Sequence, residues 1–207
     1  MLTLYFSPGS CSRACHVALE ESGLAYEGKR INFAENQQRS PDYLKLNPKG
    51  RVPALVTPKG ILTEAPAIMS YVAQTAPDAK LAPLSDPFEF ARMQAFNSYI
   101  ASTVHVAHAH GRRGTRWANQ EASLEDMKAK MPQVMTDCFT LIENEMLTGP
   151  WVLGSDYSVA DGYLFVMSGW LKGDGVDVAK FPKVHDHYMR MQERPAVKRA
   201  LEAEQRG

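Results

Sequence analysis

Two hydrophobic patterns divide the chain. Up to residue 76, short apolar runs lie between clusters of turn-forming residues, a pattern typical of strands joined by turns and helices. It predicts strands at residues 2–6, 25–33, 54–56 and 61–64, and helices at 11–23, 40–46 and 66–76. After Pro87, glycine and proline become sparse and apolar residues recur at helical spacing, which predicts a second part built only of helices.

The proline-rich segment between these parts is the best candidate for a domain boundary, because linkers are commonly exposed and rich in proline. The sequence therefore predicts a first domain at residues 1–77, a linker at 78–87 and an all-helical domain at 88–207. A chain of 207 residues is long enough to bury a substantial hydrophobic core.

Two signals define the later helices. Ser158 is followed three residues later by Asp161 and then by an apolar stretch, a variant of the capping box that opens a helix. We therefore expect Asp161 to stabilise the fold and not to act as a catalytic acid. A terminal helix at 183–204 is expected to be interrupted at Pro195, because proline cannot continue the backbone hydrogen bonds.

Composition argues against several classes of function. Lys plus Arg and Asp plus Glu both number 23, so the formal net charge is zero, which argues against nucleic-acid or membrane partners recruited by bulk charge. No apolar run approaches membrane-spanning length and the N-terminus lacks a signal-peptide pattern, so we expect a cytoplasmic protein. Three cysteines without framework spacing fit free thiols in a reducing compartment.

The stretch 47–66 carries a candidate ligand site. Pro53 stands directly before a short apolar strand, and a cis bond between Val52 and Pro53 is one way to turn the Val52 backbone outward, where it can pair with an extended peptide. Glu64 ends the next strand, and a proline two residues later suits the first turn of a helix, which leaves the Ala65 N–H at a positive helix end. A carboxylate beside such an amide matches an amino-acid zwitterion.

A candidate reactive group, Cys11, lies between the turn residues 7–10 and the first predicted helix. Backbone N–H groups at a helix N-terminus favour negative charge, so the pKa of this thiol is expected to be lowered. From these residues alone, Cys11 is either a reactive thiol or a small packed side chain. Cys15 and Cys138 fall inside predicted helices and are expected to be core residues.

Together, these stretches resemble the glutathione S-transferase family. The sequence Asn-Pro-x-Gly-x-Val-Pro-Ala-Leu from residue 47, followed by Leu-Thr-Glu-x-x-Ala-Ile from residue 62, is similar to the glutathione-binding half of these enzymes. The opening Tyr-Phe-Ser-Pro-Gly-Ser-Cys-Ser at residues 5–12 resembles the bacterial beta class, in which the thiol lies in a Pro-Gly-x-Cys-Ser turn. The match runs nearly end to end, and its motifs are specific when taken together.

The resemblance implies a fold and a site. The fold is α/β followed by all-α, with a thioredoxin-like N-terminal domain of βαβ-ββα order and an all-helical domain that holds the acceptor substrate. Glutathione is the expected co-substrate, with no cofactor and no metal. Its backbone would lie along Val52 and a cis Pro53, and its γ-glutamyl end would lie at Glu64 and Ala65. Its sulfur would meet Cys11.

The helical domain is expected to supply the other side of the site. In the beta-class pattern, the histidine at the position of His105 points at the catalytic thiol, and we expect the same role here. If the preceding helix runs on unbroken, Ser102 shares a face with His105 at i and i+3 and joins the glutathione site. His108 and His110, with the arginine pair at 112–113, are expected to line the mouth of the acceptor pocket or to face solvent, because no carboxylate or thiol lies near them in sequence to complete a metal site.

Several positions depart from the family pattern or offer alternatives. The beta-class pattern has a lysine near the end of the second strand, where this chain has Glu and Asn at 35–36, so one charged contact to glutathione is missing. An asparagine of the family pattern is replaced by Ser98, which keeps hydrogen-bonding ability with a shorter reach. Tyr5 and Ser12 are alternatives to Cys11, because related classes hold the thiolate with a tyrosine or serine hydroxyl.

The expected activity is conjugation of the glutathione thiol to small hydrophobic electrophiles, a detoxification reaction, by a homodimer like other members of the family. Two alternatives stay open. Cys11 is a thiol and not a hydroxyl, so it is able to form a mixed disulfide with glutathione and to carry out thiol-disulfide exchange. Some transferase-like domains only bind ligands or partners and catalyse no reaction.

Overall fold

The computed structural model describes residues 1–206, so Gly207, the last residue of the predicted helical domain, lies outside the described residues. Four strands form one mixed sheet in the order β2-β1-β3-β4: β1 (Leu2–Phe6), β2 (Tyr26–Arg30), β3 (Ala54–Thr57) and β4 (Gly60–Thr63). β1 pairs with β2 in parallel, whereas β3 is antiparallel to both β1 and β4. The helices of this part are α1 (Ser12–Ser22), α2 (Pro41–Leu46) and α3 (Ala65–Thr75), which gives the predicted thioredoxin-like order.

Local signals explain most of these boundaries. α1 ends at Gly23, whose φ of 69° is easily adopted only by a residue without a side chain. Ser40 caps α2 by accepting a hydrogen bond from the Tyr43 N–H, and a proline occupies the first turn. The second strand is shorter than predicted and ends at Arg30. Phe33, which was expected to end this strand, lines the cavity described below.

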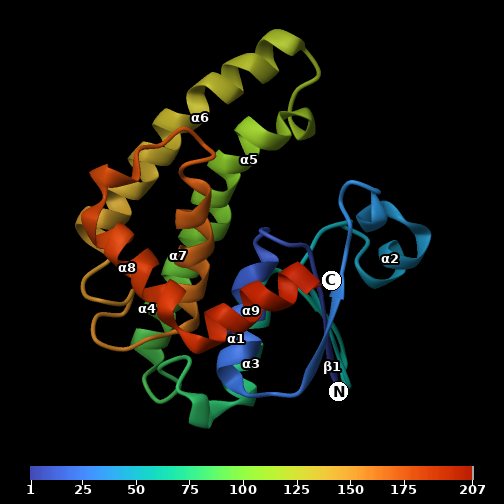
Figure 1. Cartoon of the computed structure of the whole chain (residues 1–207), viewed down its shortest axis with the longest axis vertical. Coiled ribbons are helices and arrows are strands. Elements are labelled where there is room, and N and C mark those ends of the chain that lie inside the picture. The colour runs from blue at the N-terminus through green and yellow to red at the C-terminus, as the bar shows by residue number, and fades with distance from the viewer. Residues whose placement is uncertain (207) are drawn as a thin grey trace.

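The rest of the described chain is helical, as predicted (Figure 1). Its helices are α4 (Pro87–Tyr99), α5 (His105–Arg113), α6 (Glu121–Leu141), α7 (Val159–Trp170), α8 (Pro182–Glu193) and α9 (Pro195–Arg206). A π-helical segment, Ile100–Val104, joins α4 to α5, and a short 3₁₀ turn, Gly114–Arg116, follows α5. Within residues 1–206, none of these helices combines the length and apolarity needed to cross a bilayer.

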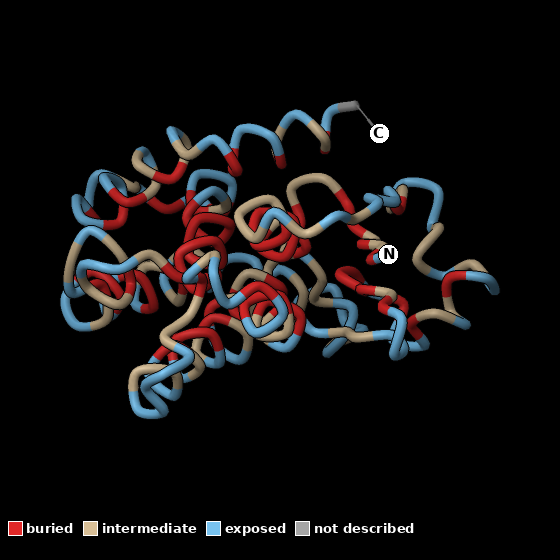
Figure 2. The backbone as a smooth tube through the Cα atoms, turned by 90° about the horizontal axis from the view of Figure 1, so that it is seen from below, coloured by how far each residue is buried: buried red, intermediate tan, exposed pale blue. Residues whose placement is uncertain are grey.

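α1 lies at the centre of the molecule, where it contacts α3, α7 and α9. One hydrophobic cluster runs through both parts of the chain and includes Leu19 of α1, Met69 of α3, Met93 of α4 and Leu164 of α7. Figure 2 shows the buried positions gathered in the middle of the fold, with exposed positions around them. The sheet part and the helical part therefore share one core, and the division at residues 78–87 stays a prediction.

The start of α7 is organised by a buried carboxylate. Asp161 Oδ2 accepts the Ser158 N–H, and Ser158 Oγ accepts the Ala160 N–H, which forms the predicted capping box. Asp161 Oδ1 also accepts the Val152 N–H at 2.8 Å and lies 3.0 Å from His187 Nε2. The side chain is fully buried and does not line the cavity described below, and its contacts tie α7 to α8 and to the loop before α7.

Replacing Asp161 with alanine is expected to lower the free energy of unfolding by about 3 kcal/mol, because several buried donors lose their acceptor at once. Denaturant unfolding followed by circular dichroism at one protein concentration measures this change. Asp156→Ala, at an exposed position before the capping box, is the control and should change the free energy of unfolding by less than about 0.5 kcal/mol. A loss below about 1 kcal/mol for Asp161→Ala would contradict the structural role.

Candidate active site

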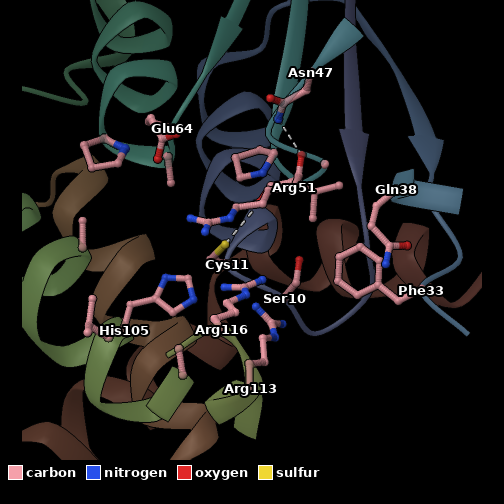
Figure 3. A pocket seen from close by; sticks show the side chains of 18 of the residues that line it. Ser10, Cys11, Phe33, Gln38, Asn47, Arg51, Glu64, His105, Arg113 and Arg116 are labelled. Atoms are coloured by element: carbon pink, nitrogen blue, oxygen red, sulfur yellow. Dashed lines mark hydrogen bonds between the residues drawn. The ribbon is translucent and has the colours of Figure 1, made fainter. Parts of the chain in front are cut away.

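A cavity of about 400 Å³ lies between the sheet part and the helical part of the protein. The wall formed by the N-terminal part of the chain contains most of the predicted site residues, namely Cys11, Val52, Pro53, Glu64 and Ala65. The opposite wall comes from α5, α7 and the turn after α5, and includes His105, Arg113, Arg116 and Trp170. Figure 3 shows that the side chains of Cys11 and His105 approach each other from the two walls. The fold thus brings the candidate thiol and the candidate histidine to one site.

The turn that carries Cys11 is held at Gly9. The Gly9 N–H donates to Glu204 Oε2 at 3.0 Å, and the Gly9 carbonyl accepts from Trp170 Nε1 at 2.9 Å. Arg13, in the first turn of α1, donates to the same Glu204 oxygen through Nε and Nη2. The φ of Gly9 is 69°, a left-handed conformation that favours glycine. Helices α7 and α9 therefore fix the peptide that leads into the thiol.

Cys11 immediately precedes α1, as predicted, and its Sγ donates to the Val52 carbonyl oxygen at 3.5 Å. The predicted lowering of its pKa is wrong, because burial raises the pKa of the thiol to about 11. Arg113 lowers this pKa and Glu64 raises it, but each effect is smaller than that of burial. Cys11 is therefore a protonated thiol at neutral pH and is able to donate a hydrogen bond to an anion in the cavity.

His105 is a neutral imidazole at neutral pH. Burial is the main cause that lowers its pKa to about 4, and His108 and the nearby arginines lower it further. A neutral ring presents one N–H donor and one acceptor nitrogen. The ring meets the Trp170 indole edge-on at 5.2 Å between centroids, so the indole that holds Gly9 also supports the histidine.

Side chains of Tyr43 and Asn47 hold the backbone before Pro53 in place. The Val52–Pro53 peptide bond is cis, as predicted. The carbonyl of Arg51 accepts hydrogen bonds from Tyr43 Oη and Asn47 Nδ2, each at 2.7 Å. Val52 itself lines the cavity, so its backbone lies where an extended peptide can reach it.

The junction between β4 and α3 forms another part of the same wall. Glu64 has φ 72° and ψ 123°, a conformation that residues with side chains rarely adopt and that is commonly found at ligand sites. Its carboxylate is ion-paired with Lys49. Ala65 is the first residue of α3 and Pro66 follows it, as predicted, so the Ala65 N–H belongs to the helix end that favours anions.

Comparison with known proteins identifies the family. The family model described as "Glutathione S-transferase, N-terminal domain" matches residues 1–74, and the model described as "Glutathione S-transferase, C-terminal domain" matches residues 113–204. Glutathione S-transferase GstA of Escherichia coli O157:H7 is 30% identical over 206 residues, which cover 98% of each chain. The chain belongs to the glutathione S-transferase family.

Solved structures agree with this assignment. A glutathione transferase homologue from Sulfitobacter, with bound glutathione, is 50% identical, covers 98% of both chains and has a TM-score of 0.95. The bacterial beta class glutathione S-transferase of Sphingomonas chungbukensis is 35% identical, with 98% coverage of both chains and a TM-score of 0.86. The beta-class resemblance found in the sequence is thereby confirmed.

Ser102 and Ser98 of this transferase lie outside the cavity. Both side chains are exposed, and Ser102 Oγ donates to the Ser98 carbonyl. The expected i, i+3 face with His105 is wrong because Ile100–Val104 is π-helical. The wider turn brings Ala101, and not Ser102, to the cavity beside His105.

The two alternative hydroxyls do not reach the cavity either. Ser12 Oγ is buried, where it accepts the Ser7 N–H and lies 2.7 Å from Ser10 Oγ. The Tyr5 ring packs against Tyr43, with 5.7 Å between centroids. Ser10, which is not among the predicted site residues, does line the cavity of the transferase.

The two remaining histidines of the predicted cluster have protein partners. His108 Nδ1 lies 2.7 Å from Asp174 Oδ2, and its ring stacks on Trp170 at 4.2 Å, so the expectation of a pocket-mouth or solvent-facing residue is wrong. His110 packs against Trp117 at 4.3 Å between ring centroids. Among residues 1–206, no three His, Cys, Asp or Glu side chains are grouped as metal ligands.

The main charged feature of the cavity is a group of four arginines, Arg39, Arg51, Arg113 and Arg116. Of these four, only Arg113 belongs to the predicted site, as part of the arginine pair at 112–113. Arg113 and Arg116 lie three residues apart, whereas Arg39 and Arg51 come from two other segments, so no local pattern groups all four. Arg39 lies a few residues beyond the position of the missing family lysine and brings a positive charge to the same cavity.

The raised pKa of Cys11 predicts slow alkylation by iodoacetamide at neutral pH. With a pKa of about 11, the thiolate fraction and the labelling rate should rise about tenfold per pH unit between pH 7 and pH 10. Mass spectrometry of the peptide that contains Cys11 measures the rate, and the buried Cys15 and Cys138 report any unfolding. Arg113→Gln should slow the labelling further. A rate that is constant from pH 7 to pH 9 would contradict the raised pKa.

Trp170→Phe is expected to lower the free energy of unfolding by about 1 kcal/mol, because the Gly9 carbonyl loses its indole donor while the ring contacts are kept. The Michaelis constant for glutathione should also rise, since the turn before Cys11 is no longer fixed. Trp117→Phe is the matched control, because that indole is 48% exposed and its N–H has no partner among the described residues. Equal stability of the two variants would argue against the role of Trp170.

Proposed function

We propose that this transferase binds glutathione in the cavity between its two parts and conjugates the glutathione sulfur to small electrophiles. The observation that carries the proposal is the convergence of Cys11, Val52 and the Glu64–Ala65 junction on one wall, opposite His105. The glutathione bound in the Sulfitobacter homologue, which is 50% identical, supports a glutathione site in this chain.

In the proposed complex, glutathione lies extended along the Val52 backbone. Its γ-glutamyl ammonium pairs with Glu64 in place of Lys49, and its α-carboxylate accepts from the Ala65 N–H at the start of α3. This arrangement directs the sulfur toward Cys11. The zwitterionic end of glutathione thus meets one negative and one positive feature of the protein.

In the conjugation, the glutathione thiolate attacks an electrophilic carbon. A carbon–sulfur bond forms from the sulfur lone pair, the leaving group departs with its electron pair, and the thiol proton passes to solvent. The thiol of Cys11 and an N–H of His105 donate hydrogen bonds to the thiolate. Arg113 and Arg51 lower the pKa of the Cys11 thiol, and they would act in the same direction on a glutathione thiol beside it.

A second candidate function is thiol-disulfide exchange through Cys11. One observation favours it: Cys11 is a free thiol on the wall of the cavity. In this reaction the Cys11 thiolate attacks a glutathione mixed disulfide, the other sulfur leaves as a thiolate, and a second glutathione thiolate resolves the protein mixed disulfide. Because the raised pKa of Cys11 makes its thiolate scarce at neutral pH, conjugation ranks first.

We also propose that the enzyme is a cytoplasmic homodimer that uses glutathione as co-substrate and no other cofactor. The family resemblance supports the dimer, and the three free cysteines fit a reducing compartment. Size-exclusion chromatography with light scattering tests the oligomeric state.

The two candidate reactions are separated by substitutions at Cys11. Cys11→Ala is expected to abolish disulfide exchange and to reduce conjugation of 1-chloro-2,4-dinitrobenzene about tenfold, because one hydrogen bond to the thiolate is lost. Cys11→Ser keeps a donor and should retain most of the conjugation. Cys138→Ala, away from the cavity, is the control and should keep both activities.

Two results would change the assignment. If Cys11→Ser loses conjugation as completely as disulfide exchange, Cys11 is a nucleophile and the second candidate replaces the first. If the wild-type protein is not retained on immobilised glutathione and has neither activity, the domain only binds ligands and the proposal fails.

A further inference from the structure

The charges that line the cavity are strongly unbalanced, although the net charge of the whole chain is zero. Arg39, Arg51, Arg113 and Arg116 contribute four positive charges. Glu64 is the one carboxylate among the described lining residues, and Lys49 already pairs with it. The lining of the cavity is therefore cationic.

None of the four guanidinium groups has a carboxylate partner within residues 1–206. Elsewhere in the protein, arginines are commonly paired: Arg13 with Glu204, Arg92 with Glu89, Arg112 with Asp174, Arg190 with Asp186, Arg194 with Glu21 and Arg199 with Glu20. Outside the cavity, Arg30 also lacks a carboxylate partner among residues 1–206, but it is exposed at the end of β2, so the convergence of several unpaired arginines is a property of the cavity. Unpaired arginines that converge on a concave site are typical of anion recognition.

Glutathione does not use all of this charge. It carries two carboxylates and one ammonium group, and in the proposed complex the ammonium pairs with Glu64. Two carboxylates and the thiolate balance at most three of the four guanidinium groups. At least one arginine is therefore left over when glutathione is bound, and Arg113 and Arg116 lie on the helical wall, opposite the wall along which glutathione is proposed to lie.

Position separates the four arginines into two pairs. Arg39 and Arg51 come from the N-terminal part, beside the wall where glutathione is proposed to lie. Arg113 ends α5 and Arg116 ends the following 3₁₀ turn, both on the helical wall. Figure 3 shows Arg113 and Arg116 reaching from this wall into the cavity toward Cys11.

The helical wall combines this charge with apolar surface. Val106 and Ala109 of α5 line the cavity near Arg113, and the half-exposed Trp117 follows Arg116 directly. An acceptor placed here meets an aliphatic and aromatic surface that ends in two guanidinium groups. The positive charges also repel one another: Arg51, Arg113 and Arg39 each lower the pKa of Arg116, in addition to the larger effect of burial. An anion bound between them relieves this repulsion.

We propose that the acceptor substrate of this transferase is an anionic electrophile, with a carboxylate or sulfonate group held by Arg113 and Arg116 and an apolar or aromatic body against Val106, Ala109 and Trp117. The proposal rests on the glutathione transferase activity proposed above and narrows the expected class of small hydrophobic electrophiles.

The chemistry of the step is the same as for a neutral acceptor. The glutathione sulfur forms a bond to the carbon that carries the leaving group, the leaving group departs with its electron pair, and the anionic group of the acceptor takes no part in bond making. The role of this anionic group is to bind the guanidinium groups of Arg113 and Arg116. Since the thiolate and an anionic acceptor repel each other, guanidinium groups beside both are needed to bring them together.

A matched pair of acceptors tests the proposal: 4-chloro-3,5-dinitrobenzoate, which is anionic, and 4-chloro-3,5-dinitrobenzamide, which is neutral. For each compound, kcat/KM is divided by the rate constant of its uncatalysed reaction with glutathione, which removes the difference in intrinsic reactivity. The wild-type enzyme should prefer the acid about tenfold, as expected for one charge-assisted hydrogen bond. The preference should shrink in 0.5 M sodium chloride, because salt screens the attraction.

Arg113→Gln and Arg116→Gln should each reduce the ratio of acid to amide several-fold, toward one. The control is Arg92→Gln, because Arg92 lies on α4 and pairs with Glu89, away from the cavity. This control should leave the ratio and both rates unchanged. Arg92→Gln also keeps the net charge equal to that of the two site variants.

The possible failures are distinguishable. If the amide and the acid react equally well in the wild-type enzyme, the anionic acceptor is overturned while glutathione transfer stands. If the site variants raise the KM for glutathione equally with both acceptors and leave the ratio unchanged, the arginines bind glutathione and the proposal is also overturned. If neither compound reacts and glutathione is not bound, the transferase function itself has failed.

Discussion

The geometry of the active site depends on the two hydrogen bonds of the Gly9 peptide. Its N–H is bound by Glu204 of α9 and its carbonyl by Trp170 of α7, so two helices from the far end of the chain fix the turn that carries Cys11. Trp170 also contacts the ring of His105, which means that one indole sets the position of both candidate catalytic groups. The helical part of the transferase therefore does more than form a substrate pocket, because it holds the thiol-bearing turn of the sheet part in place.

Features that depend on neighbours in the sequence were predictable. The first strand and the helix capped by Ser40 lie where the local patterns place them, and the capping box at Asp161 forms as expected. The junction at Glu64 and Ala65 follows equally from a strand end and a nearby proline. The cis bond before Pro53 is different, because most bonds to proline are trans and the family pattern was needed to predict it.

Features that depend on packing were not predictable from the same patterns. The helix end at Cys11 is visible in the sequence, but the loss of solvent around the thiol comes from distant elements and outweighs the helix end. Ser102 was misplaced because the spacing rule assumes an α-helix, and the π-helical segment Ile100–Val104 changes which side chain follows the cavity wall. Arg39 and Arg51 were missed because they come from segments that only the tertiary structure brings to Arg113 and Arg116.

Burial disfavours the charged forms of Cys11, His105 and Arg116 at this site, but of these three only the arginine keeps its charge at neutral pH. It keeps the Cys11 thiol protonated and the His105 ring neutral at pH 7, so neither group supplies the charge that a glutathione thiolate needs. The guanidinium group of arginine stays protonated in proteins. In the proposed complex, glutathione fills part of the cavity and displaces water, so the effective dielectric constant falls and the arginines act more strongly on an anion that enters next. Stabilisation of the thiolate and the proposed attraction of an anionic acceptor then arise from the same unpaired charges, which is a physical reason for the site to hold more arginines than glutathione has carboxylates.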